Sequence, residues 1–137
     1  MCKSAVIICD GDFPRKPYPL YLLGAADCIV CCDGALKHLA KKGITPDAVI
    51  GDMDSAPKSL LKLFSDKIVH DPDQETNDLE KAMAFCAQEG WRNPVVVGAT
   101  GKREDHTLGN VFRALAAGVP IVTERGVFHP VCGAASF

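Results

Sequence analysis

Two acidic residues two positions apart, Asp52 and Asp54, follow directly after the apolar run Ala48–Ile50. The apolar run predicts a buried strand, so the two carboxylates stand where the chain leaves a sheet. In an extended turn, residues two apart project to the same side, which lets both carboxylates share one cation. Hard anionic oxygens suit Mg²⁺, an ion that proteins hold through one or two carboxylates together with substrate phosphates. For this pair alone, a solvated acidic loop is the alternative interpretation.

Further polar groups follow the other apolar runs of the chain in the same way. They are Asp10, Gly11 and Asp12 after the first run, Asp33 and Gly34 after the second, Asp71, Asp73, Gln74 and Asp78 after the fourth, and Gly98–Arg103 after the fifth. Because ligands of an open parallel sheet bind beyond the carboxyl ends of its strands, these groups predict one shared site. Carboxylates that converge there would repel one another unless a divalent cation lies among them.

The segment from Gly98 to Arg103 is a glycine-containing loop with two cations, and a predicted helix follows it. Glycines let backbone amides approach a phosphate, and a helix N-terminus adds partial positive charge. Either Lys102 or Arg103 can supply the cation of a phosphate clamp. The loop lacks the spacing of a Walker A motif. For His106, an i, i+4 pairing with Asn110 favours an orienting role over that of a general base.

Apolar runs and helix-like segments alternate along the chain. The predicted strands are Ala5–Cys9, Cys28–Cys32, Ala48–Ile50, Lys67–Val69, Pro94–Val97 and Val119–Val122, and the predicted helices are roughly Tyr18–Ala26, Ala35–Lys42, Lys58–Phe64, Asp78–Glu89 and Asp105–Ala117. Strands that are apolar throughout indicate a sheet covered on both faces. The pattern predicts a three-layer α/β/α fold with a mostly parallel, Rossmann-like sheet. Asn77 is the expected N-cap of one helix, and Gly43, Gly90 and Gly118 are expected helix stops.

The composition limits the class of protein. The chain has 137 residues and a net charge of −2, which fits one domain and gives no basic surface for nucleic acid. No apolar run is long enough to cross a membrane, and no secretory signal is present, so we expect a cytoplasmic protein. The seven cysteines are then expected to be reduced. Cys28 and Cys31 lie within one predicted strand and face opposite sides of it, which favours buried hydrophobes over a redox or zinc motif.

Asp10 and Asp12 also resemble the D-x-D of phosphatases that use an aspartyl nucleophile. The preferred interpretation is a turn in which Gly11 lets the chain approach a nucleotide.

Four ordered blocks of sequence resemble the thiamine pyrophosphokinase (thiamine diphosphokinase) family. The blocks are Asp33–Ala35 with Leu39, Gly43–Ser55, Asp73–Ala82 and Gly98–Asn110. The resemblance implies transfer of a pyrophosphoryl group from ATP to the hydroxyl of thiamine, which gives thiamine diphosphate and AMP. It also implies a homodimer formed through a C-terminal β region. Such a transfer depends on charge neutralisation and in-line positioning more than on covalent help.

The family pattern assigns roles to particular residues of this chain. Asp52, Asp54 and Asp78 resemble the Mg²⁺ ligands. The residues expected to bind the nucleotide and its phosphates are Asp33, Gly34, Gln74, Thr76, Gly101, Arg103, His106 and Asn110. Asp78, Arg103 and Asp105 are the expected catalytic side chains, and the base that receives the thiamine proton is either Asp78 or Asp105.

The resemblance also predicts the domain organisation. Residues 1–122 are expected to form the ATP- and Mg²⁺-binding catalytic domain, and residues 123–137 to begin an incomplete C-terminal β-sandwich domain. Two positions depart from the family pattern, because Ala35 and Lys102 stand where the family has glycine. Two other functions stay open: a non-catalytic Mg-nucleotide-binding module and, with less support, an aspartyl-phosphate phosphatase that uses Asp10.

Overall fold

The computed structural model describes residues 4–73, 75–102 and 104–130, apart from the side chain of residue 106. The strands are β1 (Ser4–Ile8), β2 (Cys28–Cys32), β3 (Ala48–Gly51), β4 (Ile68–His70), β5 (Arg92–Val97), β6 (Ile121–Val122) and β7 (Val127–Phe128). The helices are α1 (Pro17–Ala25), α2 (Leu36–Lys41), α3 (Lys58–Leu63), α4 (Asp78–Glu89) and α5 (Glu104–Ala116), with the short 3-10 helices η1 (Asp33–Ala35) and η2 (Ser65–Lys67).

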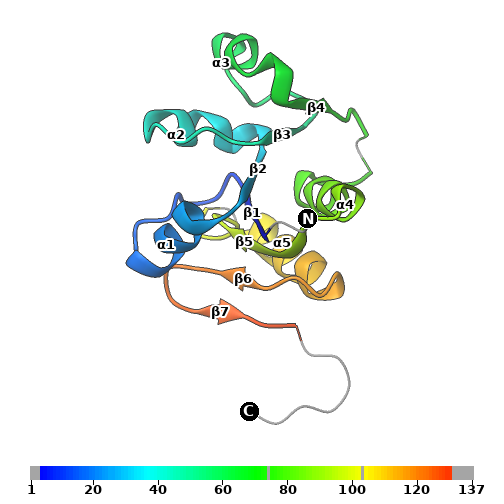
Figure 1. The fold of residues 1–137 in the computed structure, drawn as a ribbon. Coiled ribbons are helices and arrows are strands. Elements are labelled where there is room, and N and C mark those ends of the chain that lie inside the picture. The colour runs from blue at the N-terminus through cyan, green and yellow to red at the C-terminus, as the bar shows by residue number, and fades with distance from the viewer. Residues whose placement is uncertain (1–3, 74, 103, 131–137) are drawn as a thin grey trace.

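The seven strands form one mixed, mostly parallel sheet in the order β4-β3-β2-β1-β5-β6-β7 (Figure 1). Only β7 runs antiparallel, and it pairs with β6. The chain builds the sheet outward from β1 to β4 and then crosses back through α4 to β5, on the other side of β1. Strand order therefore reverses between β1 and β5, and such a switch point opens a crevice at the carboxyl ends of the strands.

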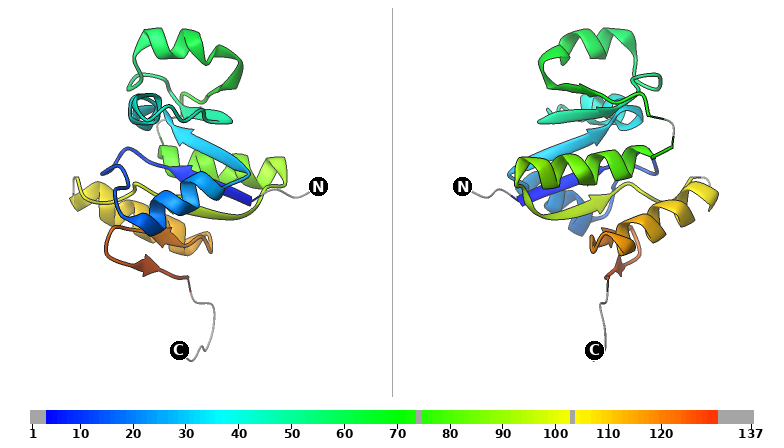
Figure 2. Two further views of the ribbon diagram at one scale, coloured as in Figure 1. Left: turned by 60° about the vertical axis from the view of Figure 1, so that its left-hand side comes forward. Right: turned by 90° about the vertical axis from the view of Figure 1, so that its right-hand side faces the viewer.

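Helices pack on both faces of the sheet, as the wholly apolar strands predicted. The ribbon views show α4 and α5 on one face and α1 on the other (Figure 2). One apolar core includes side chains of α4 and α5, and the other includes side chains of α1, α2 and α3. Within β2, every residue is buried, and Cys28 and Cys31 belong to opposite cores. The five described cysteines are buried within the two apolar cores, as predicted; Cys2 and Cys132 lie outside the described residues.

Local capping explains where several helices begin and end. The Asn77 side chain accepts a hydrogen bond from the backbone N–H of Glu80, and the Glu80 side chain accepts one from the backbone N–H of Asn77. Helix α4 therefore begins with a capping box. Gly43, Gly90 and Gly118 have positive φ angles of 70°, 72° and 75°, which confirms them as helix stops. None of the helices in the described ranges has the length and apolar character of a membrane span.

Five of the six predicted strands had boundaries that were wrong by one or two residues. The N–H of Val119 closes the last turn of α5 on the carbonyl of Ala114, at 2.8 Å, so β6 starts only at Ile121. Residue 67 belongs to η2, which moves β4 to Ile68–His70. Beyond β6, residues 127–128 form β7 on the edge of the same sheet.

Candidate active site

A cavity of about 550 Å³ opens at the switch point of the sheet. The chain segments that follow β1, β2 and β5 supply part of its lining. The start of α4, residues along α5 as far as Arg113, and Ser55 after β3 supply the rest. Of the predicted site residues, those that line it are Asp33, Gly34, Asp78, Asp105 and Asn110. Separate loops thus bring polar groups to one edge of the sheet, but Asp52, Asp54, Thr76 and Gly101 are not part of this lining.

The carboxyl groups of Asp33 and Asp78 share a hydrogen bond at the centre of this site. Asp33 lies in η1 and is only 2 % exposed, and Asp78 opens α4. Burial, followed by the negative charge of Asp33 and that hydrogen bond, raises the pKa of Asp78 from 3.8 to about 7; Asp52 adds to the rise. Asp33 and Asp52 thus both disfavour the charged form of Asp78, and a cation beside these carboxylates would relieve that repulsion.

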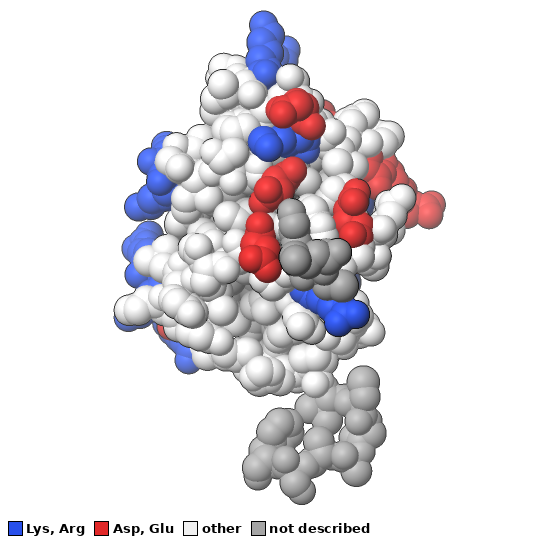
Figure 3. All heavy atoms as spheres, in the orientation of Figure 1, with Lys and Arg blue, Asp and Glu red and all other residues white. Residues whose placement is uncertain are grey.

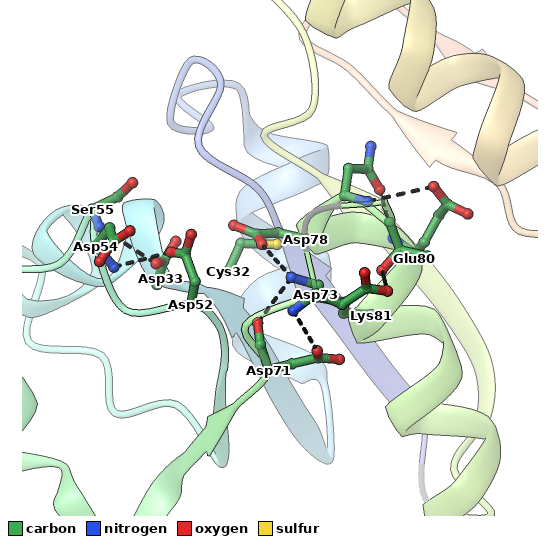
Figure 4. Close-up of polar contacts among 12 residues, drawn as sticks. Cys32, Asp33, Asp52, Asp54, Ser55, Asp71, Asp73, Asp78, Glu80 and Lys81 are labelled. Carbon is green, nitrogen blue, oxygen red and sulfur yellow. Dashed lines mark hydrogen bonds and ion pairs between the residues drawn. The ribbon is translucent and has the colours of Figure 1, made fainter.

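Lys81 is a functional candidate that the sequence analysis did not single out. Its side chain is 4 % exposed, one turn along α4 from Asp78. The ammonium group donates a hydrogen bond of 2.9 Å to the backbone carbonyl of Asp71 and lies 4.0 Å from Asp78 Oδ1 (Figure 4). The i, i+3 spacing from Asp78 is the sequence signal that could have found it. Lys81 provides the positive charge that partly offsets the raised pKa of Asp78.

The turn after β3 holds Asp52 and Asp54 in a different setting. Asp52 Oδ1 accepts the backbone N–H of Asp54 at 3.0 Å, and Met53 between them has a φ angle of 70°. Asp52 is half-buried and Asp54 is exposed. The backbone N–H of Ser55 reaches Asp33 Oδ2 at 3.4 Å, which ties the turn to η1. The turn is thus shaped by the carboxylate of Asp52 and attached to η1 by the carboxylate of Asp33.

The connection between β4 and α4 is a run of similar turns. Asp71 Oδ1 accepts from the N–H of Asp73, and Asp73 accepts from the N–H of Glu75 and from the hydroxyl of Thr76, all at 3.0–3.1 Å. These bonds, the backbone one first, lower the pKa of Asp73. The predicted nucleotide-site residue Thr76 therefore points its hydroxyl hydrogen at Asp73, and Gln74 lies outside the described residues.

Asn110 joins the two helices that border the cavity. Its amide oxygen accepts from Asn77 at 3.3 Å, and its amide nitrogen donates to the carbonyl of Ala99, which follows β5, at 3.1 Å. Asp105 stands in the exposed first turn of α5. Two further predicted site groups, Arg103 and the side chain of His106, lie outside the described part of the chain.

Two predicted phosphate-approach glycines face acidic side chains. A β-carbon on Gly34 would collide with Asp10, and one on Gly101, which has a φ angle of 95°, would collide with Asp12. Lys102 pairs with Asp10, with 3.5 Å between Nζ and Oδ1. Acidic side chains gather near the middle of the face in Figure 3, with Lys and Arg mostly toward its margins. The loops after β1 and β5 therefore contact each other, and both also line the cavity.

The chemistry of these donors suits a divalent cation, because carboxylate oxygens from η1, the β3 turn and α4 act on one another. Within residues 4–73, 75–102 and 104–130, no three acidic, histidine or cysteine side chains are already close enough together to hold an ion. The assignment of Asp52, Asp54 and Asp78 as Mg²⁺ ligands stays a prediction.

Comparison with known proteins identifies the relatives of this chain. Residues 20–122 match the family model described as thiamin pyrophosphokinase, catalytic domain. Thiamin pyrophosphokinase 1 of Caenorhabditis elegans is 31 % identical over 105 residues, which cover 68 % of this chain and 43 % of that protein. Thiamine pyrophosphokinase 1 of Oryza sativa subsp. japonica is 29 % identical over 136 residues, or 78 % of this chain and 49 % of that protein.

A solved structure agrees with these matches. Thiamin pyrophosphokinase from Geobacillus thermodenitrificans superposes with a TM-score of 0.68 at 28 % identity, covering 86 % of this chain and 58 % of that one. The chain spans about half the length of the curated relatives it matches.

Proposed function

The chain belongs to the thiamin pyrophosphokinase catalytic-domain family, and we propose that it transfers pyrophosphate from ATP to the hydroxyl of thiamine. The products are thiamine diphosphate and AMP. The observation that carries the proposal is the family match over residues 20–122, because this range includes every predicted site residue. The match does not favour the non-catalytic module or the phosphatase built on Asp10.

The reaction joins the thiamine hydroxyl oxygen to the β-phosphorus of ATP and breaks the bond from that phosphorus to the α,β-bridging oxygen. AMP leaves with the bridging oxygen, and the hydroxyl proton passes to a base. Both candidate bases, Asp78 and Asp105, line the cavity. Without a bound cation the pKa of Asp78 is raised to about 7, and Mg²⁺ at this carboxylate would lower it.

We propose Mg²⁺ as the cofactor, held by Asp52, Asp54 and Asp78 with Asp33 beside them. Bound Mg²⁺ would neutralise the phosphate charge of ATP. Asp33, buried and bonded to Asp78 and to the N–H of Ser55, connects η1 to both α4 and the β3 turn. Asn110 fixes the start of α4 against the loop after β5, which keeps the cavity walls in register.

The remaining nucleotide-site assignments belong to the same proposal. Gly34 and Gly101 would let backbone amides approach phosphate, and Gln74, Thr76 and His106 would line the nucleotide. Arg103 would place positive charge against the transferred group, where a planar fork of donors matches phosphate oxygens.

The finer features of the organisation are proposals as well. We classify residues 1–122 as a three-layer, Rossmann-like catalytic domain and residues 123–137 as the opening of a C-terminal β-sandwich that completes a homodimer. The coverage of only 43–49 % of the curated relatives supports a larger natural unit. The buried free thiols of Cys9, Cys31, Cys32 and Cys86 support a cytoplasmic location.

The test is formation of AMP from Mg·ATP with and without thiamine, on this chain and on a form extended at its C-terminus. We expect thiamine-dependent AMP from the extended form. Asp78→Asn should abolish it, whereas Asp66→Asn, at an exposed position in η2, should leave it unchanged. An extended form that folds and binds Mg·ATP but makes no thiamine-dependent AMP would contradict the proposal.

A further inference from the structure

Two thiols lie next to each other in the lining of the candidate-site cavity. Cys9 directly follows β1 and Cys32 ends β2, and these two strands are parallel neighbours in the sheet. The thiol of Cys32 donates to Cys9 Sγ, with 3.9 Å between the sulfur atoms. Among the described cysteines, only these two line the cavity.

We propose that Cys9 and Cys32 form a two-thiol site that captures a thiophilic divalent cation, Zn²⁺ or Cd²⁺, inside the cavity. A tetrahedral zinc ion with Zn–S bonds of about 2.3 Å holds two thiolates about 3.8 Å apart. The observed 3.9 Å between the sulfur atoms already matches that spacing. A disulfide would instead require the two sulfur atoms to approach to about 2.05 Å.

The binding step needs no oxidant. As each sulfur–metal bond forms, the thiol releases its proton to solvent, and the ion keeps its charge. Water can complete the coordination, so the site uses two protein ligands and does not require a third metal-binding side chain. Soft thiolates select Zn²⁺ or Cd²⁺, whereas the carboxylates nearby favour Mg²⁺, so the two kinds of cation have separate ligands in one cavity.

The captured ion would lie beside the centre of the candidate active site. Asp78 is close enough to Cys32 to act on its thiol electrostatically, and the two side chains are neighbours in Figure 4. Cys32 is also followed directly by Asp33. On the proposed function, an ion held there excludes Mg·ATP, so the thiol pair makes the site sensitive to thiophilic metals.

The test is a Cd²⁺ titration of the chain, followed by the ultraviolet charge-transfer band of sulfur–cadmium bonds. The background variant carries Cys2→Ser and Cys132→Ser, and the reductant is a phosphine that does not bind the ion. We expect saturation at one ion per chain. Cys9→Ala and Cys32→Ala should each lose at least half of the band, and the double variant should lose all of it.

Matched controls come from the other buried thiols. Cys31→Ala, on the opposite face of β2, and Cys86→Ala, in α4, should keep the full band. Because an ion that binds only the folded chain stabilises it, Cd²⁺ should also raise the Tm of the background variant. This measurement applies even if a cavity variant fails to fold.

Three results would overturn the inference: a full band in the folded double variant, equal losses in the controls, or a Tm that Cd²⁺ leaves unchanged or lowers. None of these readouts requires nucleotide or thiamine, so they are independent of the proposed function. A last arm measures Mg·ATP binding with and without bound Cd²⁺. We expect at least a tenfold loss of affinity that disappears in the double variant, and an unchanged affinity would overturn the claim that the ion blocks the nucleotide.

Discussion

Two acidic regions near the cavity use carboxylates in different ways. The α4 corner, formed by Asp33, Asp78 and Lys81, is largely buried, and its charged groups contact one another. The β3 turn, residues 51–55, is more exposed, and its carboxylate Asp52 bonds to the backbone of the turn itself. In the corner, each ionisation state therefore depends on a neighbour, whereas the turn keeps its shape through a local backbone bond.

The difference shows that the repulsion between carboxylates is concentrated in the α4 corner. Buried carboxylates that face each other lower stability unless a cation joins them, and Lys81 does this only in part, at 4.0 Å from Asp78. The turn needs no such compensation, because water screens its charges. A site for a divalent cation combines both properties: a corner that gains from the cation, and a turn that is already shaped to add ligands.

The largest effect is expected from removing the cation of the α4 corner. Lys81→Met leaves the carbonyl of Asp71 without its buried donor, so we expect a loss of about 1–3 kcal/mol in the free energy of unfolding, measured with urea. Lys62→Met, at an exposed position in the last turn of α3, is the matched control and should change it by less than about 0.5 kcal/mol. Equal losses in the two variants would show that the corner holds no special interaction.

The next effect is a dependence of stability on pH that comes from Asp78. Its pKa is about 7 in the folded chain against an ordinary 3.8, so the folded state holds a proton that the unfolded state has released between these values. The stability that this proton contributes is fully present below 3.8 and is lost as the pH rises through about 7.

Because Asp78 is 38 % exposed, solvent screening reduces the loss, and we expect about 1–2 kcal/mol. The measurement is urea unfolding of the wild type and of Asp78→Asn at about pH 4 and about pH 7. The variant should lack this part of the pH dependence. Parallel pH curves for the two proteins would contradict the raised pKa.

The sequence predicted local and periodic features well and missed those that depend on distant neighbours. The order of strands and helices followed from apolar runs, and the N-cap at Asn77 followed from its residue type at the start of a helical pattern. The i, i+3 spacing could point to Lys81 as a partner of Asp78, but it does not predict burial, because the closer partner is a backbone carbonyl that α4 meets only in the folded sheet. For the same reason, the sequence could not place Asp10 beside Gly34.

A third, smaller effect separates the cap of α4 from its link to α5. Asn77→Ala removes the capping box and the bond to Asn110, so we expect a loss of about 1 kcal/mol in stability. Asn110→Ala breaks the same link, together with the bond to the carbonyl of Ala99, but leaves the capping box. Ser59→Ala, exposed in α3, serves as the control for a neutral truncation. If Asn77→Ala costs nothing in a background that already carries Asn110→Ala, the cap contributes nothing of its own.

The smallest effect on stability is expected in the β3 turn, and it gives the clearest contrast with the corner. Asp52→Asn keeps the oxygen that accepts the N–H of Asp54, and Asp54 itself is exposed, so Asn at either position should change the free energy of unfolding by less than about 0.5 kcal/mol. If Asp52 and Asp54 bind Mg²⁺ as proposed, the same substitutions should weaken Mg-dependent ATP binding at least tenfold. An amide oxygen cannot replace the negative charge of the carboxylate that binds the ion. Binding is measured by calorimetry at several Mg²⁺ concentrations, with Asp66→Asn as the control. A turn that loses binding without losing stability is built for a ligand, whereas unchanged binding in both variants would place the cation elsewhere.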